Sequence, residues 1–334
     1  MPLIPALTLR QQVARRLQAA GAPWEHAQCV AAALVESDLR GHEGHGVQRV
    51  PQYLEEIRQG RIVPDAVPEL RQETPATAVV DGHWSFGAVA GTYALDIARS
   101  KAERGGVAAV TLRRGGHLGR LGGYVERAAE SGFIGMAVAN FGRATCPPFG
   151  GLAPRFGTNP WAFAVPAATF PPVVLDFATT AVAWGRLHLA QQTGERLPEG
   201  WVTDLQGQPL TDPSQLDQGW MFVPFGGHKG SGLMLLADIL GGALSGHGCP
   251  SLPEGQPANG ALFLVLDPHC FQPREEFLQT MDRLFRAVKE TPPAPGFEEV
   301  LLPGERGWRL KEQRLREGLW VPEEVWTACQ LPAD

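Results

Sequence analysis

The chain has 334 residues, of which 44% are hydrophobic and 19% are charged, as is typical of soluble globular proteins. That length allows about two domains with cores of their own. The net charge of −6 is spread along the sequence, so nothing indicates a nucleic-acid partner or an anionic membrane surface. We therefore expect a small-molecule ligand.

The cysteines predict a reducing compartment. There are five of them, they are far apart, and no two form a CxxC pair. This pattern favours free thiols in the cytoplasm over a disulfide framework or a zinc site held by cysteines. The first 20 residues do not read as a signal peptide, and no stretch approaches the roughly 20 apolar residues of a membrane span.

The N-terminal part has helical periodicity. Leu9, Val13 and Leu17 recur every fourth residue, and apolar residues from Val47 to Ile57 indicate another amphipathic helix that ends near Gly60. We expect residues 1–75 to form a small helical domain.

The pattern changes near Ala78 to apolar runs of strand length that alternate with helical segments. The predicted strands are 107–112, 134–139, 163–165, 173–175 and 262–266, and the predicted helices include 93–103 and 124–130. Such alternation predicts an α/β layer with a largely buried sheet over residues 76–271. The chain reads as helical again after Pro268, and we expect helices within 272–334 to join the N-terminal domain.

The segment 37–49 contains two imidazoles and a guanidinium between glycines. His42 and His45 can exchange protons near neutral pH, and Arg49 can bind a carboxylate through two parallel hydrogen bonds. The alternatives are structural histidines or a metal pair, although no third ligand is evident nearby. We expect acid/base chemistry on an anionic substrate and no metal.

His117 lies in a glycine loop directly after the predicted strand 107–112. Ligands of open α/β sheets gather at the carboxyl ends of strands, so this histidine is a second candidate for catalysis. The glycine spacing is not GxGxxG, and the next strand is followed by Asn140 rather than by an acid. An ordinary Rossmann dinucleotide site is therefore not predicted.

Two further segments are candidates for ligand binding. The run 224–232 combines glycines with Lys229 before an apolar helical run, which is either a phosphate cradle or a tight turn. It does not have the spacing of a Walker A loop. Asp176 ends the strand 173–175, where a carboxylate either fixes the tautomer of an imidazole or caps a turn.

Eight motifs in the same order resemble the type 2 malate/L-lactate dehydrogenases over almost the whole chain. The family also includes sulfolactate and ureidoglycolate dehydrogenases, diketogulonate reductase and reductases of piperideine- and pyrroline-2-carboxylate. The matching segments are 38–49, 59–62, 115–119, 157–160, 175–176, 198–201, 226–230 and 302–306.

The resemblance implies an α/β fold with a non-Rossmann mixed sheet, NAD or NADP as cofactor, and a homodimer whose active site lies near the contact between domains or subunits. It makes His45 the proton donor or acceptor, His117 a second polar or acid/base group, Arg49 the carboxylate ligand, and Asp176 the residue that orients an imidazole. The implied cofactor contacts are Asp176, Phe177, Ala178, Thr179, Thr180, Ala181, His228, Lys229, Pro303, Gly304 and Glu305.

The expected reaction is hydride transfer between nicotinamide and C2 of a small 2-hydroxy or 2-oxo acid. The alternatives are reduction of a cyclic 2-imino acid and a catalytically altered cofactor-binding dimer. The second is suggested by Gly44, because many family members have serine there. A phosphotransferase built on Lys229 would need Mg²⁺ carboxylates, and no Walker B or kinase motif accompanies the loop. The sequence does not decide between NAD and NADP.

Overall fold

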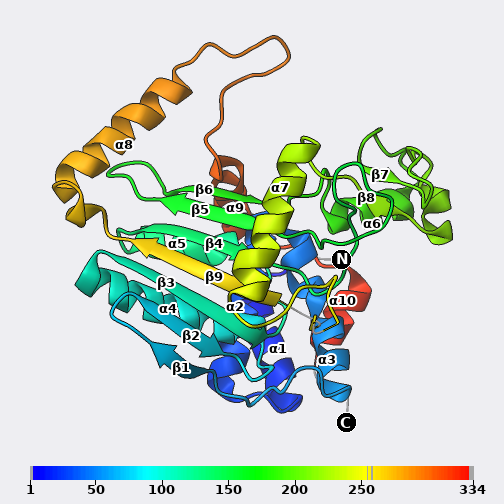
Figure 1. The fold of residues 1–334 in the computed structure, drawn as a ribbon, viewed down its shortest axis with the longest axis horizontal. Coiled ribbons are helices and arrows are strands. Elements are labelled where there is room, and N and C mark those ends of the chain that lie inside the picture. Colours follow the sequence, from blue (N-terminus) through cyan, green and yellow to red (C-terminus); the bar gives the residue numbers. More distant parts are fainter. Residues whose placement is uncertain (1–2, 254, 257–258, 331–334) are drawn as a thin grey trace.

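A computed structural model describes residues 3–253, 255–256 and 259–330. The ends of the predicted helical domain, 1–2 and 331–334, lie outside this range, as do 254 and 257–258 of the predicted α/β domain. Helices surround a central seven-stranded sheet (Figure 1).

The sheet is mixed, and its last strand lies in its middle. The order is β1 (Glu69–Glu73), β2 (Thr77–Asp81), β3 (Val107–Gly115), β9 (Asn259–Leu266), β4 (Ile134–Ala139), β5 (Trp161–Val165) and β6 (Val173–Phe177). The β2–β3 pair is parallel, and the other five pairs are antiparallel. A doubly wound Rossmann sheet is parallel, so the prediction of a non-Rossmann α/β fold is confirmed.

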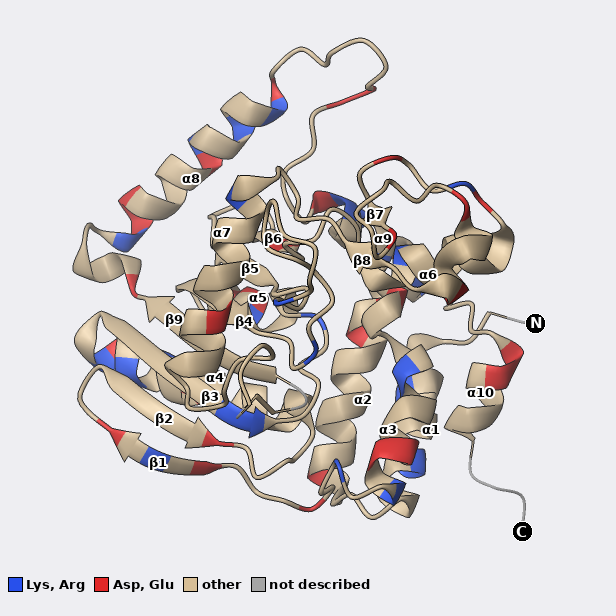
Figure 2. Ribbon diagram, turned by 45° about the vertical axis from the view of Figure 1, so that its right-hand side comes forward, with Lys and Arg blue, Asp and Glu red and all other residues tan. Residues whose placement is uncertain are grey.

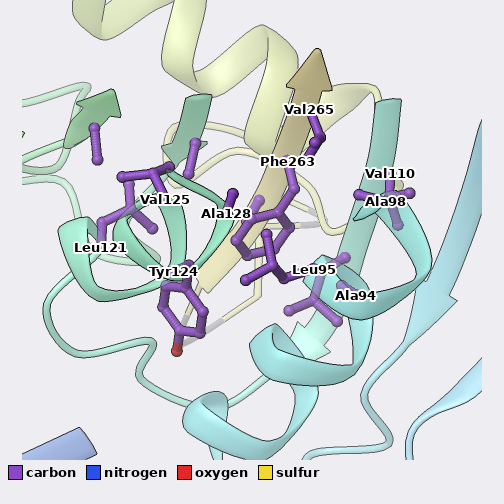
Figure 3. Close-up of a cluster of buried hydrophobic side chains, with 14 of the residues drawn as sticks. Ala94, Leu95, Ala98, Val110, Leu121, Tyr124, Val125, Ala128, Phe263 and Val265 are labelled. Carbon is purple, nitrogen blue, oxygen red and sulfur yellow. The ribbon is translucent and has the colours of Figure 1, made fainter. Parts of the chain in front are cut away.

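Each face of the sheet has its own cover because successive strand residues point to opposite sides. Helices α4 (Gly87–Gly105) and α5 (Gly122–Glu130) cover one face, where Phe263 of β9 packs between Leu95 and Tyr124 (Figure 3). Helix α7 (His228–Ala237) and its π-helical continuation η4 (Asp238–Ala243) cross the other face (Figure 1). There they pack on Trp161 and Leu262.

A second core joins the two ends of the chain. Helices α1 (Ala6–Ala19), α2 (Trp24–Leu39), α3 (Val50–Arg58) and α10 (Glu323–Cys329) share it, together with Leu319 and Val321. Ile4 and Leu319 exchange backbone hydrogen bonds of 2.9 and 2.8 Å. The N-terminal and C-terminal helices therefore fold as one unit at this point.

The other C-terminal helices lie elsewhere. Helix α9 (Glu305–Glu317) packs on α2. Helix α8 (Arg274–Lys289) lies at the periphery (Figure 1), where Asp282 accepts hydrogen bonds from the backbone N–H groups of Ala168 and Thr169. Strand β1, within the predicted helical domain, pairs with β2 in the sheet. The domain division at residue 75 remains a proposal.

A small subdomain follows β6. It contains α6 (Trp184–Thr193), β7 (Val202–Thr203), the 3₁₀-helix η3 (Pro213–Gln218) and β8 (Met221–Phe222). Its own cluster of buried side chains includes Leu187, Val202 and Phe222. Another short 3₁₀-helix, η5 (Pro268–Cys270), follows β9.

Charged residues of both signs are interspersed, for example along α8 (Figure 2). No helix in the described ranges is both long and apolar enough to cross a bilayer.

The turn after α2 is held by a buried carboxylate. It consists of two 3₁₀-helices, η1 (Glu43–His45) and η2 (Val47–Arg49), joined at Gly46. Asp38, at the end of α2, accepts a hydrogen bond of 2.8 Å from the backbone N–H of Val47. Burial raises the pKa of Asp38 to about 7. A Cβ at Gly46 would lie 1.7 Å from Oδ1 of this carboxyl group, so only glycine fits.

The Gly46→Ala variant is expected to lose about 1–3 kcal/mol of unfolding free energy, because the new methyl group overlaps Asp38. The control is Gly105→Ala at the last residue of α4, where the same methyl group meets open space and is expected to be neutral or slightly stabilising. Urea unfolding of both variants makes the comparison. Equal stability of the two would show that the turn relaxes around the carboxylate.

Candidate active site

Two imidazoles from distant segments meet at the centre of the site. His45 ends η1, and His117 lies in the loop after β3. Their rings are stacked, with centroids 5.3 Å apart and planes 18° apart. Both side chains are half-buried, so a ligand has access to them. The structure thus brings together two of the residues that the sequence singled out.

Arg49 is fixed in the same turn as His45. Its Nε donates to the carbonyl oxygen of Gly44 at 2.6 Å, and its Nη1 donates to Oε1 of Gln52 at 2.7 Å. Its Nη2 has no hydrogen-bond partner within the described ranges. The guanidinium is therefore held from one side and has a terminal nitrogen left for an anion.

The surroundings of His45 favour the neutral form of its imidazole. Burial lowers the pKa of its imidazole to about 3, and the charge of Arg49 adds to the shift. Its Nδ1 is buried and has no hydrogen-bond partner in the part of the chain that the structure describes. A buried polar atom without a partner is costly, which is consistent with a bound molecule completing the site.

Tyr53 is a member of the site that sequence analysis missed. Its hydroxyl lies 2.9 Å from Nδ1 of His117. It follows Arg49 by four residues, so both lie on the same face of the helical segment around α3. That spacing was the available signal, but a tyrosine on an amphipathic helix reads as a core residue.

Asp176 lies near the site, but its hydrogen bond goes to the backbone. Its Oδ2 accepts from the N–H of Gly122 at 2.7 Å. No hydrogen bond joins it to an imidazole among the described residues. Burial raises its pKa, while Arg120 and His42 act in the opposite direction through their charges. Its predicted role in orienting an imidazole is therefore a proposal, and His42 is the histidine that it influences.

A buried ion network lies behind these groups. Glu126 of α5 pairs with Arg40 at 2.5 Å and with Arg120 at 3.1 Å, and all three side chains are at most 5% exposed. Arg40 also pairs with Glu36 and stacks on the ring of Trp308. Sequence analysis assigned no function to these residues.

Two of the predicted cofactor segments lie side by side. The N–H of Ala181 donates to the carbonyl of Val223 at 2.8 Å, and the N–H of Phe225 donates to the carbonyl of Thr179 at 3.0 Å. These bonds place the run from Asp176 to Ala181 beside the glycine loop that starts α7. The hydroxyl of Thr180 donates to the carbonyl of Val182, and Phe177 packs edge-on against Phe225.

The glycine loop is a tight turn that leads into α7, and the backbone N–H groups of Gly227, Gly230 and Ser231 donate to carbonyl groups of the same segment. Gly226 and Gly227 have φ angles of 57° and 63°, and a Cβ at Gly230 would lie 2.2 Å from the carbonyl oxygen of Phe225. His228 and Lys229 begin α7 and are exposed. The helix N-terminus and Lys229 both attract negative charge, so the loop is a candidate for binding an anion.

The third predicted cofactor segment lies at the free edge of β6. The carbonyl of Pro303 accepts from the N–H of Val174 at 3.1 Å, and Gly304 packs against Val174 with a φ of 84°. Glu305 already pairs with Lys289 at 2.8 Å and with Arg309. A cofactor contact here would therefore come from the backbone rather than from this carboxylate.

No group of three metal-binding side chains occurs in residues 3–253, 255–256 and 259–330.

Comparison with known proteins identifies the family. The sequence model described as malate/L-lactate dehydrogenase matches residues 4–330. L-sulfolactate dehydrogenase of Methanocaldococcus jannaschii is 37% identical over 92% of this chain and 89% of its own. A sulfolactate dehydrogenase (NADP(+)) of Chromohalobacter salexigens is 36% identical over 92% and 91%. Ureidoglycolate dehydrogenase (NAD(+)) of Escherichia coli is 33% identical over 96% and 92%.

Solved structures agree with this result. Malate dehydrogenase of Entamoeba histolytica has a TM-score of 0.93 and 28% identity over 98% of this chain and 96% of its own. Delta1-piperideine-2-carboxylate reductase of Pseudomonas syringae has a TM-score of 0.85 and 29% identity over 99% of both chains. The predicted resemblance is confirmed, and the chain belongs to the malate/L-lactate dehydrogenase family of oxidoreductases.

Proposed function

We propose that the protein catalyses NAD(P)-linked hydride transfer at C2 of a small 2-hydroxy or 2-oxo carboxylic acid. The observation that carries this proposal is the stacked pair of His45 and His117 beside Arg49. Oxidation of a 2-hydroxy acid needs a cation that binds its carboxylate and a base that accepts its hydroxyl proton. The guanidinium of Arg49 and the two imidazoles provide these groups in one pocket.

Arg49 binds the substrate carboxylate through the nitrogen that the protein leaves unpaired. His45, being neutral, accepts the hydroxyl proton when the substrate is oxidised and returns it when the oxo acid is reduced. A bound carboxylate offsets the charge of Arg49, which raises the pKa of His45 and favours this proton uptake. The nicotinamide, when bound, accepts or supplies the hydride.

The residues proposed to hold the cofactor are those of the three adjoining segments described above. The glycine loop with Lys229 would bind the diphosphate, and the runs 176–181 and 303–305 would flank it. Relatives named for NAD(+) and for NADP(+) both occur, so both remain candidates.

Reduction of a cyclic 2-imino acid is the second candidate, because a solved relative that covers 99% of the chain is named piperideine-2-carboxylate reductase. The same pocket suits it, since Arg49 would bind the carboxylate and an imidazole would supply the proton to nitrogen.

A spectrophotometric screen tests both candidates. The purified protein is mixed with NADH or NADPH and a panel of 2-oxo acids and cyclic imines, and loss of the reduced nicotinamide absorbance is followed. Turnover is expected with one substrate class. Cofactor binding seen by NADH fluorescence without any turnover would instead favour the catalytically altered dimer.

His45→Ala and Arg49→Ala are expected to separate two roles. Loss of the imidazole should lower kcat by about 10²- to 10⁴-fold with nearly unchanged cofactor affinity. Loss of the guanidinium should mainly raise KM for the carboxylate substrate, because it removes binding. Arg58→Ala, at an exposed position at the end of α3, is the control. Steady-state kinetics that leave wild-type values in either site variant would remove that residue from the mechanism.

We also propose a cytoplasmic homodimer that binds a small carboxylate and neither nucleic acid nor membrane. The cytoplasmic location rests on the widely spaced cysteines. The dimer rests on an apolar stripe along α7 and η4, which lies on the outer surface. Its members are Leu235, Leu236, Ile239 and Leu244, each between 45 and 59% exposed.

Ile239→Arg should convert the dimer to a monomer, because it places a charge in the centre of this stripe. Leu7→Arg, at a 69% exposed position of α1, is the control and should leave the mass at twice 36.0 kDa. Light scattering after size exclusion measures both. A dimeric Ile239→Arg protein would place the interface elsewhere.

A further inference from the structure

The hydroxyl group of Tyr53 singles out one nitrogen of His117. Tyr53 is 4% exposed, and its ring centroid lies 6.1 Å from those of both His117 and Phe86. The hydroxyl is 2.9 Å from Nδ1 of His117. Nε2, on the other side of the ring, is the nitrogen left for a ligand.

The backbone around His117 is held independently of Tyr53. Gly116 donates its N–H to the carbonyl of Ser85 at 2.9 Å, and Leu118 donates its N–H to Oδ1 of Asn259 at 3.0 Å. The carbonyl of Leu118 accepts from the hydroxyl of Tyr124 at 2.7 Å. These backbone contacts do not fix the orientation or the tautomer of the imidazole.

The direction of the Tyr53 hydrogen bond follows from burial. Burial raises the pKa of Tyr53, so its hydroxyl keeps the proton. His117 is the hydroxyl's one hydrogen-bond partner within the described ranges, so the proton has to be donated to Nδ1 to be satisfied. Burial also lowers the pKa of His117 well below its usual range, and the charge of Arg49 adds to this shift. The ring is therefore neutral, with its single proton on Nε2.

The two stacked imidazoles thus differ. Nδ1 of His117 is occupied by Tyr53, whereas Nδ1 of His45 is buried without a partner among the described residues. A hydrogen bond that fixes the protonation of one ring nitrogen determines whether the other nitrogen is a donor or an acceptor.

We propose that Tyr53 is a positioning residue that holds His117 in the neutral Nε2–H tautomer, so that His117 donates a fixed hydrogen bond to the substrate oxygen at C2 while His45 carries the proton. In oxidation the substrate O–H bond breaks and its proton goes to His45. The hydride leaves C2 for the nicotinamide with its electron pair, and the C=O bond forms. The Nε2–H bond of His117 stays intact throughout. This catalytic part rests on the proposed function, but the tautomer does not.

The tautomer is tested without turnover. Full-length protein labelled with ¹⁵N-histidine is studied by NMR, and the His117 signals are assigned from their loss in His117→Asn. The expected spectrum has an unprotonated Nδ1 and a protonated Nε2, and Tyr53→Phe should mix the two tautomers. Tyr124→Phe is the matched control, since it removes a buried hydroxyl that holds the same loop through its backbone. An Nδ1–H tautomer in the unaltered protein overturns the inference.

Kinetics with the substrate found in the screen test the role. Tyr53→Phe should lower kcat by about 10- to 100-fold with little change in KM, as expected for loss of a group that orients a reacting side chain. Tyr124→Phe should lower the melting temperature and leave kcat unchanged. Equal kcat in the two variants overturns the positioning role. Absence of turnover with every substrate overturns the proposed function and the role of His117 in it, while NMR still decides the tautomer.

Discussion

The hydrogen bond between the Asp38 carboxylate and the Val47 backbone determines the geometry of the site. It holds the N–H of Val47, which lies two residues after His45 and two residues before Arg49. Because the carboxylate belongs to α2, whose apolar face is in the N-terminal core, both functional side chains inherit their positions from that core. Gly46 is part of the same constraint, since a side chain there would displace the carboxylate.

A second constraint is the charge buried behind the pocket. Glu126 holds Arg40 from the helical core and Arg120 from the loop after β3, so one carboxylate joins the two structural units. Removing it would leave the buried guanidinium of Arg120 without its ion-pair partner, at a typical cost of about 3–5 kcal/mol. The charge of Arg120 also lowers the pKa values of His42 and His45, after the larger effect of burial. A bound anion would therefore offset the positive charge of the arginines around the pocket.

The sequence predicted the apolar strands better than the polar one. The strands β3, β4, β5 and β9 were expected because buried strands are short apolar runs, and the edge strand β6 carries the same apolar signal. β1, with the sequence ELRQE, is mostly exposed and polar, so no such signal marks it. The insertion of β9 between β3 and β4 could not be read at all, since local patterns carry no information on strand order.

The site shows the same division. His45 and Arg49 are close in sequence, and the family motifs paired them with His117. Tyr53 escaped because its chemistry depends on a contact with a residue in another loop. Asp176 was expected either to orient an imidazole or to cap a turn, and the hydrogen bond that its carboxylate accepts from the backbone N–H of Gly122 is one that no side-chain pattern reveals.

The pocket takes its side chains from two separate hydrophobic cores. His45, Arg49 and Tyr53 come from segments anchored in the helical core, whereas His117 and Asp176 come from the sheet. A molecule that contacts both sets couples the stability of the two cores, because it binds only while both are folded. A substrate held by the proposed site would touch both sets, so saturation with it should raise the melting temperature of the two cores together.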